Sequence, residues 1–432
     1  MKEIVVKWNR EYFDDKLSLA CLEEFDKTDD KNRELVELID TWLYYFHAAG
    51  GRAQNFSSLF ARFFATGAAS YLPSLWARIP PITRGGRLRG MDRVAHEVLG
   101  FPAGRAIRFL DVGCGYPPLT TVDTAEGCIA WSCVGIDPNF PTWILHDEDG
   151  NAACFDETGT MVYVQYLQGD LQPGPDQILK DSQRYSLEWD RVSRDLALEA
   201  EAIRAKRLVR NPAAHFGRSN LSFSSTSLMG MHTVQPFDFI RCMNVFMYFD
   251  GRGILDHLRY AKSLLSPQGV FVCGSVNEIG VSAKYLAYRK RREVLTPWLF
   301  GFDLVKFSQR EGNGFWGFHK DQPDTLFLAS VIRMVSENQP LFARVTSVID
   351  RVEEVLGTAT RDRHGYLREE RTVSGTARYT QLLAAVGSEC GEEIITFLGS
   401  KGLSAEINPS GHLLIDLPGS SRRLYERYFP LL

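Results

Sequence analysis

A short apolar run leads directly into a glycine-rich turn about a quarter of the way along the chain. The run is Arg108-Phe109-Leu110-Asp111-Val112, and Gly113-Cys114-Gly115 follow it. The run has the length and composition of a buried strand, and the two glycines let the backbone bend sharply and approach a ligand closely. A helix that starts after such a turn offers N–H groups without partners in the helix. We therefore predict a strand, a ligand-binding turn and a helix.

Further apolar runs follow, and helical stretches separate several of them. This alternation is typical of a parallel sheet with helices on both faces. Strands are predicted at 107–112, 132–136, 162–167, 237–242 and 269–273, and later strands at 304–307 and 326–332. The predicted fold class is α/β, with a doubly wound, mostly parallel sheet of seven strands.

The 432 residues predict three successive parts. Residues 1–100 show helical periodicity with many aromatic side chains and are expected to form a helical cap. Residues 101–336 carry the strand–helix alternation, with insertions at 143–161, where two hairpin turns are expected, and at 174–212, which has a helical period. Residues 337–432 are expected to form a small α+β module that ends in a hairpin.

Composition excludes several classes of protein. The chain has 49 Lys plus Arg against 53 Asp plus Glu, so no long-range attraction to nucleic acid or an anionic membrane is expected. A basic run at 289–292 is interpreted as the solvated face of a helix. The 8 cysteines form no CxxC pair, and no segment reaches the ~18 apolar residues of a membrane span. Residues 1–8 lack the apolar region of a secretory signal, and a cytoplasmic location is expected.

Three carboxylates follow predicted strands or lie at their ends. Asp111 precedes the glycine turn, Asp137 ends the next strand, and Asp170 with Leu171 follows the third. An acid at the end of the second strand can accept hydrogen bonds from both hydroxyls of a ribose. Pro118 stands where a dinucleotide-binding turn has its third glycine, which disfavours a nicotinamide-dependent dehydrogenase. A ligand with a cationic amino acid moiety fits the turn better than a diphosphate.

Two later motifs complete the pattern. Residues 237–250 read as a strand, a polar turn at Asn244 and an aromatic helix start, and residues 264–274 read as a Ser-Pro-Gln-Gly turn followed by a strand. In this order, the five motifs resemble class I S-adenosylmethionine-dependent methyltransferases over about residues 100–335. Residues 242–250 and the turn at 264–269 look most like the chemotaxis receptor glutamate methyltransferases, although Met243 stands where that subgroup has a basic residue.

The resemblance implies a Rossmann-like core and S-adenosylmethionine as the cofactor. Asp111 and the glycine turn would surround the methionine part, Asp137 the ribose and Asp170 the adenine. The residues implied for cofactor binding are Asp111, Gly113, Cys114, Gly115, Asp137, Pro138, Asp170, Leu171, Cys242, Met243 and Asn244.

The acceptor end is predicted from fewer residues. Asn244 and Tyr248 are candidate contacts with the methyl acceptor, and His232 is a candidate general base, which is needed only for an acceptor that arrives protonated. An Asp-x-Asp-x-Asn spacing at 147–151 lacks the glycine and distal glutamate of a calcium loop, so a hairpin turn is expected there. No metal site is predicted.

The predicted function is methyl transfer to an O or N atom of a small molecule or natural-product intermediate. A protein or peptide methyltransferase, acting on a carboxyl or amide group, and a non-catalytic cofactor-binding subunit are the alternatives. The expected partner is the methyl acceptor, with neither nucleic acid nor membrane, and a homodimer is compatible with the sequence.

Overall fold

The computed structural model describes residues 2–13, 16–29, 31–56, 58–62, 85–166, 175–233, 235–276, 282–307, 317–356 and 373–417, with a few single residues between 64 and 74. The chain divides into two compact units. The first consists of Met1–Leu72 with Gln235–Leu432, and the second is Pro73–Val234. These boundaries do not coincide with those predicted at residues 100 and 336. Each unit is described by itself.

The second unit contains three parallel strands among its described residues. They are β1 (Ile107–Val112), β2 (Trp131–Ile136) and β7 (Leu221–Ser224). Helix α7 (Leu119–Gly127) connects β1 to β2, and helix α6 (Arg89–Glu97) contacts α7. Side chains of β1 are buried at nearly every position, as expected for a strand covered on both faces. The predicted strands at 107–112 and 132–136 are confirmed.

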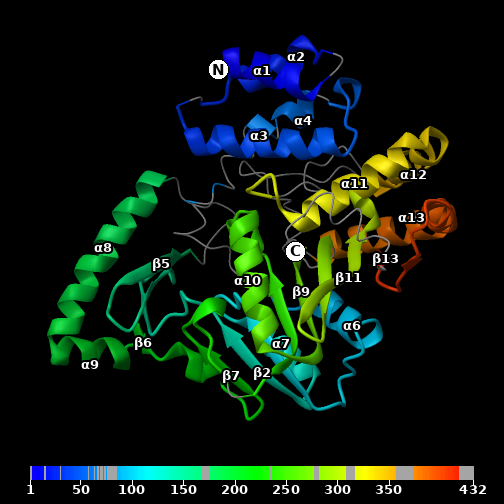
Figure 1. The fold of residues 1–432 in the computed structure, drawn as a ribbon. Coiled ribbons are helices and arrows are strands. Elements are labelled where there is room, and N and C mark those ends of the chain that lie inside the picture. Colours follow the sequence, from blue (N-terminus) through cyan, green and yellow to red (C-terminus); the bar gives the residue numbers. More distant parts are fainter. Residues whose placement is uncertain are drawn as a thin grey trace. The chain divides into compact units, whose positions relative to one another are not determined.

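A second, antiparallel sheet in this unit has the order β5-β4-β3-β6. Its strands are β3 (Trp143–His146), β4 (Ala152–Phe155), β5 (Met161–Gln165) and β6 (Leu208–Arg210). Helices α8 (Pro175–Arg194) and α9 (Leu196–Arg204) pack beside this small sheet (Figure 1). The hairpin turns predicted within 143–161 are confirmed, because Asp147 and Asp156 each accept backbone hydrogen bonds from the turn that follows them.

The predicted place of the strand at 162–167 is wrong. The strand exists as β5, but it pairs antiparallel with β4 in the small sheet, and β7 pairs with β2 in the parallel sheet. Alternation of apolar residues identifies a strand but not its partner, and both segments satisfy the same pattern.

The first unit contains a mixed sheet whose strands have the order β12-β13-β11-β10-β9-β8. The strands are β8 (Phe237–Met243), β9 (Leu265–Val276), β10 (Ala283–Arg291), β11 (Val294–Asp303), β12 (Ala405–Ile407) and β13 (His412–Asp416). Strands β8 and β9 are parallel and are joined by helix α10 (Gly251–Leu264), whereas the other pairs are antiparallel. The C-terminal hairpin is present as predicted, and its strand β13 extends the sheet by pairing with β11.

Three expectations for this unit are wrong. Leu304–Phe307 is a 3-10 helix and not a strand, and the residues predicted as a strand at 326–332 lie within helix α11 (Pro323–Glu337). Helix α11 is buried on nearly all sides, and its segment 326–332 is apolar except for Ser330, so periodicity cannot distinguish this segment from a buried strand. The basic run at 289–292 spans the end of β10 and the turn to β11 instead of a helix. Among the described residues, neither unit holds a seven-stranded sheet.

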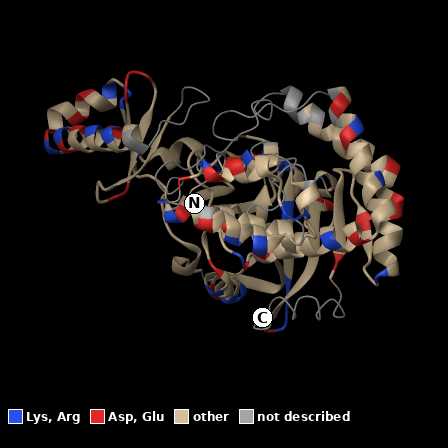
Figure 2. Cartoon of the chain, turned by 90° about the horizontal axis from the view of Figure 1, so that it is seen from above, with Lys and Arg blue, Asp and Glu red and all other residues tan. Residues whose placement is uncertain are grey.

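Helices make up the rest of the first unit. They are α1 (Lys2–Tyr12), α2 (Leu19–Asp26), α3 (Arg33–Ala48), α4 (Ser58–Arg62), α12 (Gln339–Leu356) and α13 (Val373–Ser400). Helices α1 to α4 share an aromatic core in which Phe46, Phe56 and Phe60 contact one another. Helix α3 packs against α11 (Figure 1). Acidic and basic side chains are interspersed along the helices (Figure 2), and no helix of the described residues is long and apolar enough to cross a membrane.

Candidate functional site

The turn after β1 is held against the end of β2. Gly113 and Gly115 have φ angles of 73° and 62°, in the left-handed region where glycine has no steric cost. The backbone N–H groups of Gly113 and Cys114 both donate to the carbonyl of Ile136, at 2.8 and 3.1 Å. The glycines therefore turn the chain so that it crosses the carboxyl end of the neighbouring parallel strand.

Asp137 closes this turn with its side chain. Its Oδ2 accepts a hydrogen bond from the Gly115 N–H at 3.1 Å, and its Oδ1 accepts one from the Asn139 N–H at 2.8 Å. Burial raises the pKa of Asp137, and the two N–H donors oppose that rise. Each carboxylate oxygen has a second lone pair, so Asp137 can accept from two further donors, such as adjacent hydroxyls. The sequence-predicted neighbours Gly115, Asp137 and Pro138 are brought together, with Pro138 exposed beside them.

Asp111 is anchored to the helix that follows the turn. It is 3% exposed, and its Oδ2 accepts a hydrogen bond from Thr121 Oγ1 on α7 at 2.7 Å. Cys114 lies between the two acids and is also buried. Burial and the carboxylates of Asp137 and Asp111 hold the pKa of this thiol well above its usual range.

Two supports of the turn were missed by sequence reasoning. Gly135 on β2 lies against Phe223 of β7, and a Cβ at this position would come within 2.7 Å of the Phe223 ring. Gln165, at the end of β5, donates from Nε2 to the carbonyl of Tyr116. The small sheet therefore helps to hold the turn, although its strands belong to the insertion.

The strand that pairs with β2 on the side away from β1 is β7. Asp170 and Leu171 lie outside the described residues. The Asp137 N–H donates to the Ser224 carbonyl at 3.3 Å, and Ser225 Oγ lies 3.4 Å from the Pro138 carbonyl. The residues after β7 therefore lie beside Asp137. The alternation Leu221-Ser222-Phe223-Ser224 is the signal in the sequence that could have identified this strand.

Asn244 forms a bridge between two strands of the first unit. Its Nδ2 donates to the Val276 carbonyl at 3.0 Å, and its Oδ1 accepts from the Val276 N–H at 2.8 Å. Its backbone has a φ of 60°, which asparagine tolerates better than most residues. The amide therefore continues the pairing of β8 with β9 beyond the end of β8. Cys242 and Met243, just before it, are buried in the sheet.

The other two candidates for the acceptor end, Tyr248 and His232, belong to different units of the chain. Tyr248 is 39% exposed in the 3-10 helix η6 (Phe246–Tyr248), with its ring centroid 5.5 Å from that of Phe318. His232 is exposed in the second unit, after η5 (Leu228–Gly230). The roles predicted for Tyr248 and His232 stay predictions.

A buried group of charged side chains near the end of β11 was also missed. Asp303 is fully buried, and its Oδ2 accepts from the Ala283 N–H at 2.9 Å and lies 3.7 Å from Lys306 Nζ. Lys284, 1% exposed, lies 3.7 Å from Asp324 Oδ2 at the start of α11. Burial lowers the pKa of Lys284 to about 8, although Asp324 opposes that change. Asp303 and Lys306 are three residues apart, but Lys284 and Asp324 are distant from them in the sequence, and no local motif marks the group.

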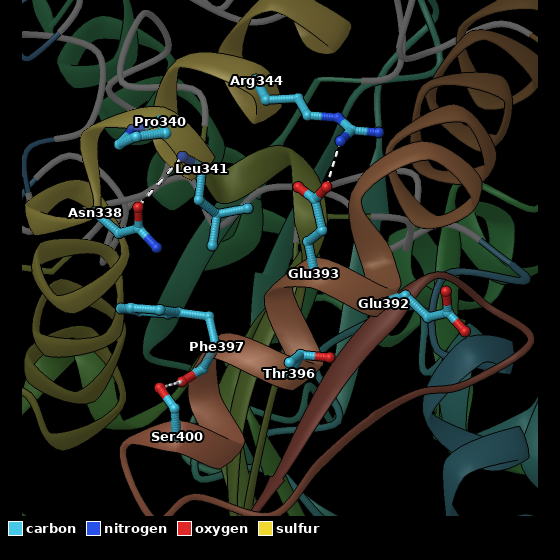
Figure 3. Close-up of a pocket in the computed structure, with 9 residues that line it drawn as sticks. All are labelled: Asn338, Pro340, Leu341, Arg344, Glu392, Glu393, Thr396, Phe397 and Ser400. Carbon is cyan, nitrogen blue, oxygen red and sulfur yellow. Dashed lines mark hydrogen bonds and ion pairs between the residues drawn. The ribbon is translucent and has the colours of Figure 1, made fainter.

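An open groove of about 610 Å³ lies between α12 and α13 (Figure 3). Its lining residues are Asn338, Pro340, Leu341, Arg344, Glu392, Glu393, Thr396, Phe397 and Ser400. Arg344 and Glu393 form an ion pair within it, and both side chains are about half exposed. None of the sequence-predicted site residues lines this groove. Across the described part of the chain, no cluster of His, Cys, Asp or Glu has the arrangement of a metal site.

Comparisons with known proteins add little to this geometry. No protein-family model and no curated protein matches the chain. Among solved structures, the N-methyltransferase NodS of Bradyrhizobium japonicum WM9 is similar at 16% identity and a TM-score of 0.22, with 44% of this chain and 68% of that chain covered.

Two further solved structures are similar at the same level. Magnesium protoporphyrin IX methyltransferase of Synechocystis PCC 6803, with bound SAH, has 12% identity, a TM-score of 0.21 and coverage of 49% and 68%. A putative protein-L-isoaspartate O-methyltransferase of Plasmodium falciparum has 11% identity, a TM-score of 0.21 and coverage of 68% and 93%. Likenesses at such TM-scores carry no weight for the activity of this chain, which is therefore inferred from its own residues.

Proposed function

We propose that the chain is an S-adenosylmethionine-dependent methyltransferase whose cofactor binds at the glycine turn of the second unit. The observation that carries the proposal is the arrangement of Asp137 at the end of β2. Its carboxylate closes the turn through the Gly115 N–H and keeps lone pairs for the two hydroxyls of a ribose. Parallel sheets bind ligands at the carboxyl ends of their strands, where this carboxylate lies.

The neighbouring residues suit the other parts of such a cofactor. The left-handed glycines, Gly113 and Gly115, bring the backbone close to the methionine part, near the buried Asp111. Asp170 and Leu171 remain the proposed adenine contacts, and the polar residues that follow β7, beginning with Ser225, lie beside Asp137 on the same side of the turn. When bound, the cofactor supplies an electrophilic methyl group on a sulfonium, and the chain's contribution is to hold and orient it.

The proposed acceptor is an O or N atom of a small molecule or natural-product intermediate, in a cytoplasmic setting. Tyr248 is the retained candidate for contact with the acceptor because its side chain is exposed. Asn244 is not proposed to contact the acceptor through its amide, since both polar atoms of that amide are bound to Val276.

Calorimetric titration of the full chain with S-adenosylmethionine and S-adenosylhomocysteine tests the cofactor site. Micromolar binding of both is expected in the wild type. Asp137→Ala removes both turn contacts and both free acceptors, and Asp137→Asn keeps the size but removes the charge. Each is expected to weaken binding by at least ~30-fold, since hydrogen bonds to a charged group are worth ~1.5–3 kcal/mol.

Asp190→Ala is the matched control, because Asp190 is an exposed acid on α8 whose described ion pair joins it to Arg194. It is expected to bind like the wild type. Absence of heat with both ligands, in a sample whose circular dichroism shows it folded, would contradict the proposal. Incubation of fractionated cell extract with labelled methyl donor then separates small-molecule from protein acceptors by the size of the labelled product.

A further inference from the structure

Residues 317–322, which we call the strap, precede helix α11 in the first unit. The strap contacts two regions far from it in the sequence: the N-terminal helices α1 and α3, and the loop between β8 and α10 that carries Tyr248. Both sets of contacts lie within one compact unit. Figure 1 shows α3 beside the start of α11, where the strap ends.

Side chains of the strap form hydrogen bonds with the backbone of the loop after β8. Gln322 Nε2 donates to the Phe249 carbonyl at 2.7 Å, and Asp321 Oδ2 accepts from the Gly251 N–H at the same distance. The approach at Gly251 is close enough that a Cβ there would lie 2.5 Å from Asp321 Oδ2. The loop is thus fixed on both sides of Asp250, which caps α10.

A buried tyrosine of α3 holds the other side of the strap. The Tyr45 hydroxyl donates to the His319 carbonyl and accepts from the Gln322 N–H at 3.0 Å. Tyr45 is 0% exposed and Gln322 is 2% exposed, so the hydrogen bond between them is shielded from water. Losing a buried partner costs more than losing an exposed one, because the remaining polar groups cannot turn to solvent.

A second contact joins the strap to α1 and α3. Lys320 Nζ lies 2.5 Å from Asp40 Oδ2 and donates to the Tyr12 hydroxyl at 3.1 Å. Oδ1 of Asp40 accepts from Trp8 Nε1 at 2.9 Å and from the Tyr12 hydroxyl at 2.7 Å. Lys320 is 44% exposed, so its ion pair contributes little by itself, and Tyr45 is the stronger connection.

We propose that Tyr45 is a positioning residue of the methyltransferase, which acts through the strap to hold the loop that carries Tyr248. This inference rests on the proposed function for the role of that loop. The N-terminal helices then contribute to turnover without touching the reacting atoms. The path has two steps, a buried one from Tyr45 to Gln322 and a partly buried one from Gln322 to Phe249.

Hydrogen exchange of the full chain, read by mass spectrometry, tests the mechanical part without any ligand. Tyr45→Phe keeps the ring and removes both hydroxyl bonds, and Gln322→Ala removes the bond to Phe249. In both variants, amides at 246–253 are expected to exchange about tenfold faster, while amides at 270–273 of β9 stay at the wild-type rate.

Thr41→Val is the matched control. Thr41 is buried on α3, like Tyr45, and its hydroxyl bonds the Glu37 carbonyl within the same helix. It is expected to leave exchange at 246–253 unchanged. The mechanical part is overturned if Tyr45→Phe leaves that exchange unchanged or if Thr41→Val accelerates it equally.

Labelled methyl transfer, with the acceptor fraction from cell extract, tests the catalytic part. Tyr45→Phe is expected to lower kcat about tenfold with KM for S-adenosylmethionine unchanged, and Thr41→Val to change neither. A loosened loop with wild-type kcat would overturn the positioning role. Failure of the wild type to bind S-adenosylmethionine would instead refute the proposed function, and the exchange experiment would still decide whether the strap holds the loop.

Discussion

The glycine turn after β1 and the polar turn after β8 look alike in the sequence but differ in hydrogen bonding. Each follows the end of a buried parallel strand, and each contains a residue in the left-handed region, Gly115 in one and Asn244 in the other. In the first, Asp137 uses one lone pair of each carboxylate oxygen to hold the turn. In the second, the amide of Asn244 is bound at both ends by Val276.

The difference shows that a polar residue at the carboxyl end of a strand is not by itself a ligand contact. Whether such a residue can bind a ligand depends on the hydrogen-bonding capacity that remains after it has stabilised its own turn. A carboxylate can accept several hydrogen bonds, whereas an amide that donates to and accepts from one peptide unit has little left in that direction. Asp137 therefore keeps acceptors that the proposed ribose contact can use, whereas the amide of Asn244 is engaged by Val276.

The largest expected effect is a loss of stability that distinguishes the polar turn at Asn244 from the glycine turn. Asn244→Ala loses both hydrogen bonds to Val276 and places a Cβ-bearing residue without a local hydrogen bond at a φ of 60°. The free energy of unfolding is expected to fall by about 3 kcal/mol, with S-adenosylmethionine affinity within twofold of the wild type. Denaturant unfolding and calorimetry measure the two quantities.

Asn244→Gly isolates the backbone part, because glycine adopts this φ without strain. The free energy of unfolding of Asn244→Gly should lie between that of Asn244→Ala and that of the wild type. A large loss of cofactor affinity in either variant, in folded protein, would mean that Asn244 binds the cofactor after all.

The next effect concerns Asp111, whose side chain, like that of Asn244, is hydrogen-bonded to another residue of the chain. Thr121→Val removes a buried hydrogen bond to the carboxylate without changing the side-chain volume much. Stability is expected to fall by about 2 kcal/mol, and cofactor affinity by less than tenfold. Thermal unfolding with and without S-adenosylmethionine measures both. An effect on affinity larger than that of Asp137→Asn would reverse the order of importance of the two acids.

The pH dependence of binding should distinguish Asp137 from an ordinary exposed acid. Burial raises its pKa above 3.8, and hydroxyl donors of a ligand favour the ionised form. Affinity for S-adenosylmethionine should therefore be constant at neutral pH and fall about tenfold per pH unit below this raised pKa. Titrations from pH 7.5 down to the lowest pH at which the chain stays folded measure it. Asp137→Asn, which cannot titrate there, should show weak binding without this dependence.

The smallest effect tests the buried charges at the end of β11. The pKa of Lys284 is lowered from 10.5 to about 8, so between these values the unfolded chain binds more protons than the folded chain. Stability attributable to Lys284 therefore rises with pH across this interval, by roughly 1 kcal/mol per pH unit. Urea unfolding at pH 7.5, 8.5 and 9.5 measures the slope. Lys284→Met should lack this component, and an identical slope would show that other groups cause it.

Strands with strong local signals could be predicted from the sequence. The strands at 107–112, 132–136 and 237–242 were found because each is a compact apolar run next to a turn. Helix α11 was mistaken for a strand, since burial on most sides removes the amphipathic pattern that identifies a helix. Strand β10 was missed because its basic residues suggested an exposed helix, whereas Lys290 is buried and donates to the Leu265 carbonyl.

The candidate site was predictable to the same extent. The spacing of Asp111 and Asp137 follows from one strand–helix–strand unit, and the structure brings Gly115 and Asp137 together as expected. The engagement of Asn244 could not be predicted, because Val276 lies 32 residues later and presents only its peptide group. The pairing of β7 with β2 could not be predicted either. The insertion before β7 contains β5, whose pattern of apolar residues is just as typical of a strand.

The support of the glycine turn by β5 and β7 also has a consequence for synthesis on the ribosome. Gln165 follows Tyr116 by 49 residues, and Phe223, which packs against Gly135, is later still. When β1 and β2 leave the exit tunnel, Phe223 has not yet been added to the chain, because it lies far beyond the end of β2. A nascent chain stalled before residue 221 lacks the third parallel strand. The support of the glycine turn is therefore complete only after β7 has emerged.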